Sequence, residues 1–189
     1  MSPLKIIEKY YQKNTLQYEI LILHSNSVAE KSLQIIENKQ LDVDKNFVYE
    51  AAMLHDTGIF LTNAPSIHCF GAHDYIEHGY LGADILRAEN LPKHALVCER
   101  HTGTGITLQE IIDKQFPLPL RDMQPISLEE QLICYADLFF SKTHLNKELP
   151  VEKVRQKVAV WGQHSVEKFE EWNGIFGLSE KEHKSHKFF

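Results

Sequence analysis

Cysteine and long apolar runs are scarce in this chain of 189 residues, and each scarcity excludes a class of protein. The three cysteines, Cys69, Cys98 and Cys134, are scattered and odd in number, so the sequence predicts neither a disulfide framework nor a Cys-x-x-Cys zinc site. The apolar run at residues 18–23 is interrupted by Glu19 and is far too short to cross a bilayer. The opening residues, MSPLKIIEKYY, contain no signal-peptide core. We therefore expect a soluble protein of the reducing cytoplasm with no membrane partner.

Positively charged residues are fewer than negatively charged ones: the chain has 20 Lys and Arg residues, 26 Asp and Glu residues and a net charge of −6. Such a balance argues against an extended nucleic-acid partner. Hydrophobic residues at 43% and charged residues at 24% are close to globular averages, which excludes a disordered or collagen-like chain. Histidine, by contrast, is plentiful: the chain has 11 histidines but only 9 glycines.

Apolar residues recur at helical spacing along most of the chain, and no strand pattern stands out, so the sequence predicts an all-α fold. We expect a first helix to begin near residues 24–27. A second is expected to begin at its N-cap, Asp44, and to end at Gly58. A third covers about residues 74–90, and a short fourth helix begins at Pro92.

The second half of the chain contains one weakly patterned region between two predicted helices. Three prolines between residues 103 and 125 favour a loop or lid. Ser127 and Glu130 form a capping-box pattern that starts the next helix, and a last long helix covers about residues 151–172. We expect a single domain over residues 1–189, with a compact helical core at about 15–145. A helical extension at about 150–175 and a polar tail at 177–189 complete it.

Three polar features on these apolar helices point to a metal site. His55 and Asp56 form a His-Asp dipeptide near a helix end, and imidazole plus carboxylate is a ligand set that suits Zn, Mn, Fe or Ni. Asp137 lies in an apolar helix, where a carboxylate is costly unless it is paired or bound to a cation. His24 follows an apolar run. Each feature alone has an ordinary structural explanation, whereas their order along the chain, His, His-Asp, Asp, is distinctive.

With these residues in that order, the chain resembles the HD-domain metal-dependent phosphohydrolases, and more narrowly the HDIG subset, over about residues 15–142. The resemblance implies a helical HD-domain bundle in which His24, His55, Asp56 and Asp137 bind a metal ion. The chain reads His-Asp-Thr-Gly where the subset reads His-Asp-Ile-Gly, and Thr57 supplies no ligand. It lacks the Gly-Tyr-Pro signature of the cyclic-di-GMP phosphodiesterases, so that activity is not supported.

Two further histidines bear on the number of metal ions. His78 and His101 resemble positions where some HD families supply ligands to a second metal, and in that arrangement Asp56 bridges the two ions. The alternative is that both are pocket histidines beside a single metal. The expected cofactor is thus one or two divalent ions among Mn, Fe, Ni, Co and Zn, with Mg also open.

Positively charged residues near these ligands are candidates for binding a substrate phosphate. Arg100 is adjacent to His101, and Lys142 follows Asp137 by five residues, although surface salt bridges explain either one equally well. Arg121 could enter the site from the lid. We expect solvent-exposed positions for the remaining histidines: His68, His73, His94, His144, His164, His183 and His186.

The function expected from this resemblance is hydrolysis of a small phosphate ester or nucleotide by metal-activated water, with Asp56 orienting that water. No Gly-Lys-Ser/Thr phosphate loop and no nucleophile-elbow pentapeptide competes with it. Two alternatives stay open: a di-iron oxygenase of the same fold, and a non-catalytic metal-containing module that senses a ligand. A homodimer is also open, because the C-terminal helix with Trp161 and Trp172 can pack on the core or on a second copy.

Overall fold

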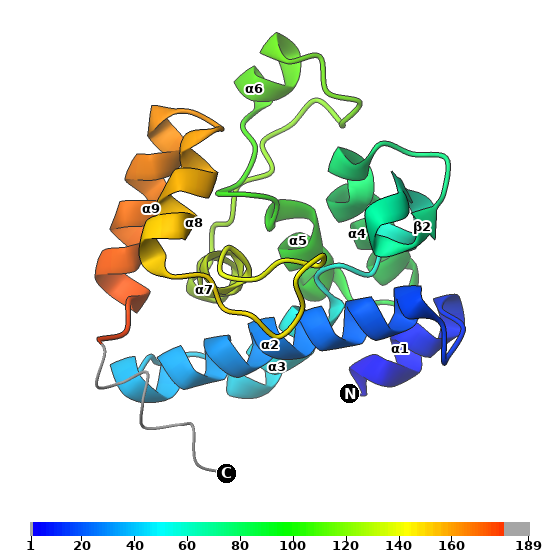
Figure 1. The fold of residues 1–189 in the computed structure, drawn as a ribbon, viewed down its shortest axis with the longest axis horizontal. Coiled ribbons are helices and arrows are strands. Elements are labelled where there is room, and N and C mark those ends of the chain that lie inside the picture. The colour runs from blue at the N-terminus through cyan, green and yellow to red at the C-terminus, as the bar shows by residue number, and fades with distance from the viewer. Residues whose placement is uncertain (1, 180–189) are drawn as a thin grey trace.

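The computed structural model describes residues 2–179, and helices dominate them, which confirms the all-α prediction (Figure 1). The α-helices are α1 (Pro3–Tyr10), α2 (Leu16–Lys39), α3 (Lys45–Leu54), α4 (His78–Ala88), α5 (Pro92–Arg100), α6 (Leu108–Asp113), α7 (Leu128–Asp137), α8 (Val151–Ala159) and α9 (Gln163–Phe176). Short 3-10 turns occur at Ile59–Leu61, Pro65–Ile67 and Tyr75–Glu77. The sequence did not predict the small antiparallel pair of β1 (Asn63–Ala64) and β2 (Cys69–Phe70), which lie on either side of the second of these turns. Most of the predicted tail, with His183 and His186, lies outside the described residues.

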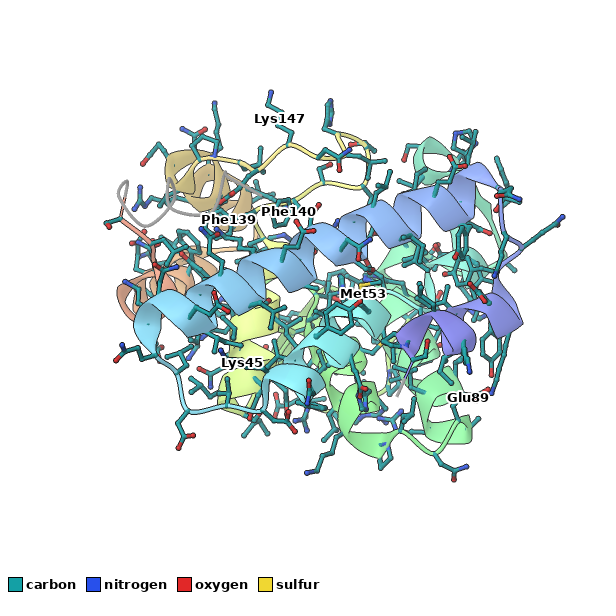
Figure 2. All side chains as sticks on the ribbon, turned by 90° about the horizontal axis from the view of Figure 1, so that it is seen from below. Lys45, Met53, Glu89, Phe139, Phe140 and Lys147 are labelled. Atoms are coloured by element: carbon teal, nitrogen blue, oxygen red, sulfur yellow. The ribbon has the colours of Figure 1, made fainter. Side chains whose placement is uncertain are left out.

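Helix α2 runs along one edge of the molecule and packs against α3 and α7 (Figures 1 and 2). It begins at Leu16, so the expected start near residues 24–27 was wrong. The hydroxyl of Thr15 accepts a hydrogen bond from the Tyr18 N–H and caps the helix eight or more residues earlier. The first turns bury Ile20 and Leu21 in a different apolar cluster from the later turns, so one continuous apolar stripe does not mark the whole helix.

Helix α3 begins as predicted, because the Asp44 carboxylate accepts hydrogen bonds from the N–H groups of Asn46 and Phe47 at 3.0 Å. It ends at Leu54 rather than at Gly58. The Leu54 carbonyl accepts hydrogen bonds from both the N–H and the hydroxyl of Thr57, which closes a turn around the His-Asp dipeptide. The dipeptide is therefore displayed just past the helix end.

The C-terminal half departs from the prediction in two places. The expected loop at residues 103–125 contains α6, which is capped by reciprocal hydrogen bonds between Thr107 and Glu110. The expected single helix at 151–172 is two helices, because Gly162 between α8 and α9 adopts φ 122°, a conformation that favours glycine. In Figure 1, α6 projects at the top and α8 and α9 form a hairpin on one side.

Two apolar clusters form most of the interior. The larger joins α2 and α3 to α7, α8 and α9, and includes Tyr135, Phe169 and Trp172. The second joins the N-terminal turns of α2 to α1, α4 and α5. His24 lies between the α2 residues of one cluster and those of the other, so the candidate ligands occupy the junction of the two. Within residues 2–179, the structure contains no helix with the length and apolar character needed to cross a membrane.

Candidate metal centre

The carboxylate of Asp56 lies at the centre of four histidines, and its two oxygens face different pairs. Its Oδ2 is 3.1 Å from Nε2 of both His24 and His55. Its Oδ1 is 3.4 Å from Nε2 of His78 and 3.3 Å from Nε2 of His101. Asp56 is fully buried, so these imidazoles form its immediate environment. The arrangement presents two adjacent clusters of donor atoms that share one carboxylate.

Asp137 completes the first cluster from the C-terminal end of α7. Its Oδ1 is 2.9 Å from Nε2 of His24 and 3.6 Å from Nε2 of His55. The two imidazole nitrogens are themselves 3.3 Å apart. In the second cluster, Nε2 of His78 and Nε2 of His101 are 3.1 Å apart. Nitrogen atoms this close to one another and to carboxylate oxygens require a cation between them, either a proton or a metal ion.

Backbone carbonyls fix the orientation of three of these imidazoles. Nδ1 of His55, His78 and His101 donates to the carbonyl oxygen of the residue three positions earlier, at 2.6, 2.6 and 2.7 Å. A carbonyl can only accept, so Nδ1 carries the hydrogen, and in the neutral ring the lone pair is on Nε2. The repeated pattern arises because each histidine closes the first turn beyond a helix or 3-10 end or begins the next helix. It is the outer-shell support that metal-binding histidines use.

The pKa shifts differ between the cluster around His55 and the cluster around His78. Burial disfavours a charge on His55, but the carboxylates of Asp56 and Asp137 outweigh it and raise the pKa of His55 to about 10. Burial and the neighbouring His101 lower the pKa of His78 to about 3, although Asp56 acts in the opposite direction. Burial favours a neutral Asp56, but His55 and Lys142 hold its pKa well below the usual range. The site therefore contains charged carboxylates that hold positive charge on His55.

These residues fit divalent metal ions. Neither oxygen of Asp56 has a described partner with hydrogen-bond geometry, even though the Lys142 ammonium lies 2.7 Å from Oδ2. A buried carboxylate left in this way is costly, and a bound cation removes that cost. Histidine nitrogen and carboxylate oxygen are the donors that Zn, Mn, Fe, Ni and Co accept. The donor atoms of His24, His55 and Asp137 lie within 4.8 Å of one another, as do those of His55, Asp56 and His101.

Comparison with known proteins identifies the family. Residues 21–140 match the model of the HD domain. The chain belongs to the HD-domain family. HD domains in general bind divalent metals and act as hydrolases, which agrees with the donor set just described.

Curated relatives of this HD-domain protein include one of similar size and two that are much longer. An uncharacterized protein of Methanocaldococcus jannaschii is 34% identical over 145 residues, which cover 74% of this chain and 78% of the relative. Two proteins named tRNA (cytidine(56)-2'-O)-methyltransferase, from Picrophilus torridus and Thermoplasma volcanium, are 30% and 31% identical over 63% and 74% of this chain. The matched parts are only 31% and 37% of those two proteins, so the chain spans about a third of their length. No solved structure shows a significant match.

A cavity of about 320 Å³ opens beside the candidate metal centre of this HD-domain protein. His78, His101 and Asp137 form part of its wall, so a ligand in the cavity reaches both donor clusters. Tyr75 stacks on His78 at the wall, with ring centroids 4.7 Å apart and planes 18° apart. The volume is at the lower end of the range for small-molecule sites.

The two predicted phosphate-binding residues have different positions. Lys142 lines the cavity, and its ammonium contacts the carboxylate of Asp56 at 2.7 Å. Burial opposes its charge, but Asp56 outweighs this and raises the pKa of Lys142. Arg100 is absent from the cavity wall; its guanidinium pairs with Glu130 at 2.9 Å and ties α5 to α7. Although Arg100 is adjacent to His101 in the sequence, its side chain pairs with Glu130 and does not line the cavity.

The remaining candidates lie outside the cavity wall. Arg121 pairs with Glu99 at 2.6 Å, and His73 pairs with Glu77 at 3.1 Å. His68, His144 and His164 are exposed as expected. His94 was expected to be exposed, but only 11% of its side chain is accessible, and it packs edge-on against Phe47.

Several cavity residues were not anticipated from the sequence, among them Tyr75, Lys157 and Trp161. Trp161 had been noted only for packing. Lys157 and Trp161 belong to the α8–α9 hairpin, which follows the family match and carries no motif. No local signal in the sequence marks them, because their place in the wall depends on how the hairpin packs on α7.

Proposed function

We propose that this protein is a metal-dependent phosphohydrolase that cleaves a phosphate ester of a small nucleotide or phosphorylated metabolite. The observation that carries this proposal is the Asp56 carboxylate, whose two oxygens face two separate histidine pairs beside a cavity. Two donor clusters that share a carboxylate suit a binuclear site. Such sites are used to clamp the oxygens of a phosphoryl group during in-line displacement.

The reaction replaces the ester P–O bond by a bond from phosphorus to the oxygen of water, and the leaving oxygen gains a proton. Divalent ions, when bound, supply hydroxide at neutral pH and offset charge on the phosphoryl oxygens. Asp56, His24, His55 and Asp137 would hold one ion, and Asp56, His78 and His101 the other. The three carbonyl-anchored imidazoles keep their rings in place, so little reorganisation accompanies the reaction.

Lys142 supplies a fixed positive charge at the same point. Its Nζ is held near Asp56, and only 11% of its side chain is accessible, so it faces the cavity with little conformational freedom. An ammonium in this position binds the transferred phosphoryl group and offsets the negative charge that develops on it.

The cavity dimensions and the charge balance favour a small substrate. A volume of about 320 Å³ accommodates a small molecule, and the net charge of −6 offers no extended basic surface for a polynucleotide. The name of the two tRNA methyltransferases describes proteins about three times as long as the matched segment. Because two relatives carry that name, a tRNA is included for comparison among the substrates to be tested.

The proposal is tested with protein that has been stripped of metal and reloaded separately with Mn, Fe, Co, Ni, Zn or Mg. Each form is assayed for phosphate release from a panel of nucleotides, sugar phosphates and aryl phosphates, and for cleavage of tRNA. We expect turnover of small esters with at least one metal and none after stripping. The Asp56→Ala variant is expected to lose metal and turnover together.

Arg100→Met is the matched control, because it removes a positive charge near the site that does not line the cavity. It is expected to keep its turnover. Phosphate release by Asp56→Ala at the wild-type rate would refute the proposal. Oxygen consumption by a two-iron form, with no hydrolysis by any form, would favour the oxygenase alternative instead. Bound metal with neither activity would favour the sensing module.

A further inference from the structure

Part of the cavity wall comes from a segment of the chain beyond the family match. That match ends at residue 140, whereas residues 141–143 and the α8 side of the hairpin also line the cavity. Lys157, Val158 and Trp161 are the hairpin residues concerned. The residues that decide which ester fits therefore include ones that are separate from the metal-binding core.

The wall contains two lysines in different electrostatic situations. Lys142 is neutralised by Asp56, which its ammonium contacts. Among residues 2–179, no carboxylate lies close enough to Lys157 to form an ion pair with it. The ammonium of Lys157 donates a hydrogen bond to the carbonyl oxygen of Leu138, 3.4 Å from Nζ. Lys157 thus lines the cavity without a paired carboxylate among the described residues, and burial lowers its pKa.

Much of the remaining lining is apolar and aromatic. Tyr75, Phe140 and Trp161 contribute rings to it, with Val158 and Leu138 beside them. About 37% of Trp161 and 39% of Tyr75 remains accessible, so ring faces or edges are available to a ligand. A small molecule with an apolar middle and charged ends matches this distribution of groups.

We propose that Lys157 binds a second anionic group of the substrate within this cavity. The substrate is then a phosphate ester whose apolar or aromatic part separates the phosphate from a carboxylate or a second phosphate. This inference rests on the proposed function, since it places the reacting phosphate at the metal centre beside Lys142. In either case the anion would be held by an ammonium that pairs with no carboxylate of residues 2–179.

Binding of compounds that cannot be hydrolysed tests the inference without relying on turnover. Calorimetric titrations of Mn-loaded protein compare alkylphosphonates with ω-carboxyalkylphosphonates and alkane-α,ω-bisphosphonates of matched chain length, from propyl to hexyl. We expect at least one doubly anionic compound to bind about tenfold more tightly than its alkylphosphonate, as a charge-assisted hydrogen bond provides. The preferred member shows whether the second anion is a carboxylate or a phosphonate.

Lys157→Met is expected to abolish this preference while leaving alkylphosphonate binding and metal content unchanged. Lys153→Met, one turn earlier on α8, is the matched control, because Lys153 is exposed and does not line the cavity. It should retain the tenfold preference.

Three results would overturn the inference: no preference in the wild type at any chain length, an equal loss for both compound classes in Lys157→Met, or the same loss in Lys153→Met. Failure of the proposed function has a different signature. In that case no ester is hydrolysed by any metal form, while the preference for two anions and its loss in Lys157→Met persist.

Discussion

Gly58 allows two segments that carry candidate ligands to approach each other, and its replacement by alanine is the most informative perturbation of the fold. It lies two residues after Asp56 and has φ −85°, which any residue adopts, so its role is to leave space. A Cβ atom there would lie 2.3 Å from the carbonyl oxygen of His78 and 2.4 Å from the backbone nitrogen of Gly82. Both are backbone atoms, which cannot rotate away as a side chain does.

The magnitude follows from the geometry. Over-packing a tight interior typically costs 1–3 kcal/mol, and a clash with two backbone atoms of α4 belongs at the upper end, about 3 kcal/mol. For a protein of this size each kcal/mol lowers the melting temperature by roughly 2–4 °C, so Gly58→Ala should melt roughly 6–12 °C below the wild type. The shift that relieves the clash separates Asp56 from His78, so we also expect weaker metal binding.

Thermal unfolding followed by circular dichroism, with and without added metal, checks this prediction. Gly174→Ala is the control, because Gly174 is exposed on α9 and a Cβ there meets no atom within 4 Å. Alanine in that helix should raise stability by up to about 1 kcal/mol. A Gly58→Ala protein that melts with the wild type and binds metal equally well would refute the close approach described here.

Three further predictions concern single residues. Lys142→Met should keep its metal but lose about tenfold or more in kcat/KM for a phosphate ester, because a charge-assisted contact is removed; unchanged kinetics would contradict its role. Asp44→Ala removes the cap of α3 and should cost about 1 kcal/mol in a denaturant titration, with no change in metal content. Metal binding at pH 7 should release a proton from His55, because its pKa of about 10 keeps it protonated in the metal-free protein and a ligand must be neutral. Apparent affinity should then rise between pH 7 and 9; calorimetry in buffers of different ionisation enthalpy measures the release, and its absence would be inconsistent with a protonated His55.

Local patterns in the sequence predicted most of the helices and failed where the cause was not local. The caps at Asp44 and Ser127 begin α3 and α7, because an oxygen side chain satisfies helix-end N–H groups wherever it occurs. The start of α2 was missed, because Ile20 and Val28 on the same helix face two different apolar clusters. The last predicted helix is divided at Gly162 because of the backbone conformation of this residue. The apolar repeat continues on both sides of Gly162, so it gave no sign of the break.

The candidate site shows the same distinction. The order of four histidines and two aspartates identified six residues that the structure brings together. Five of them lie at or next to a helix end, whereas His24 lies within α2. Proximity in sequence was a poor guide to side-chain direction for Arg100, which pairs with Glu130 instead. Lys157 could not be anticipated, because its position in the cavity depends on how the α8–α9 hairpin packs on the core.

The central claim is that Asp56 joins two metal subsites. The most direct test is the metal-to-protein ratio of the wild type and of the His78→Ala and Asp56→Ala variants, measured by elemental analysis after loading and removal of free metal. The account predicts about two ions per chain in the wild type, about one in His78→Ala, and almost none in Asp56→Ala. One ion in the wild type, with the same ratio in His78→Ala, would contradict it.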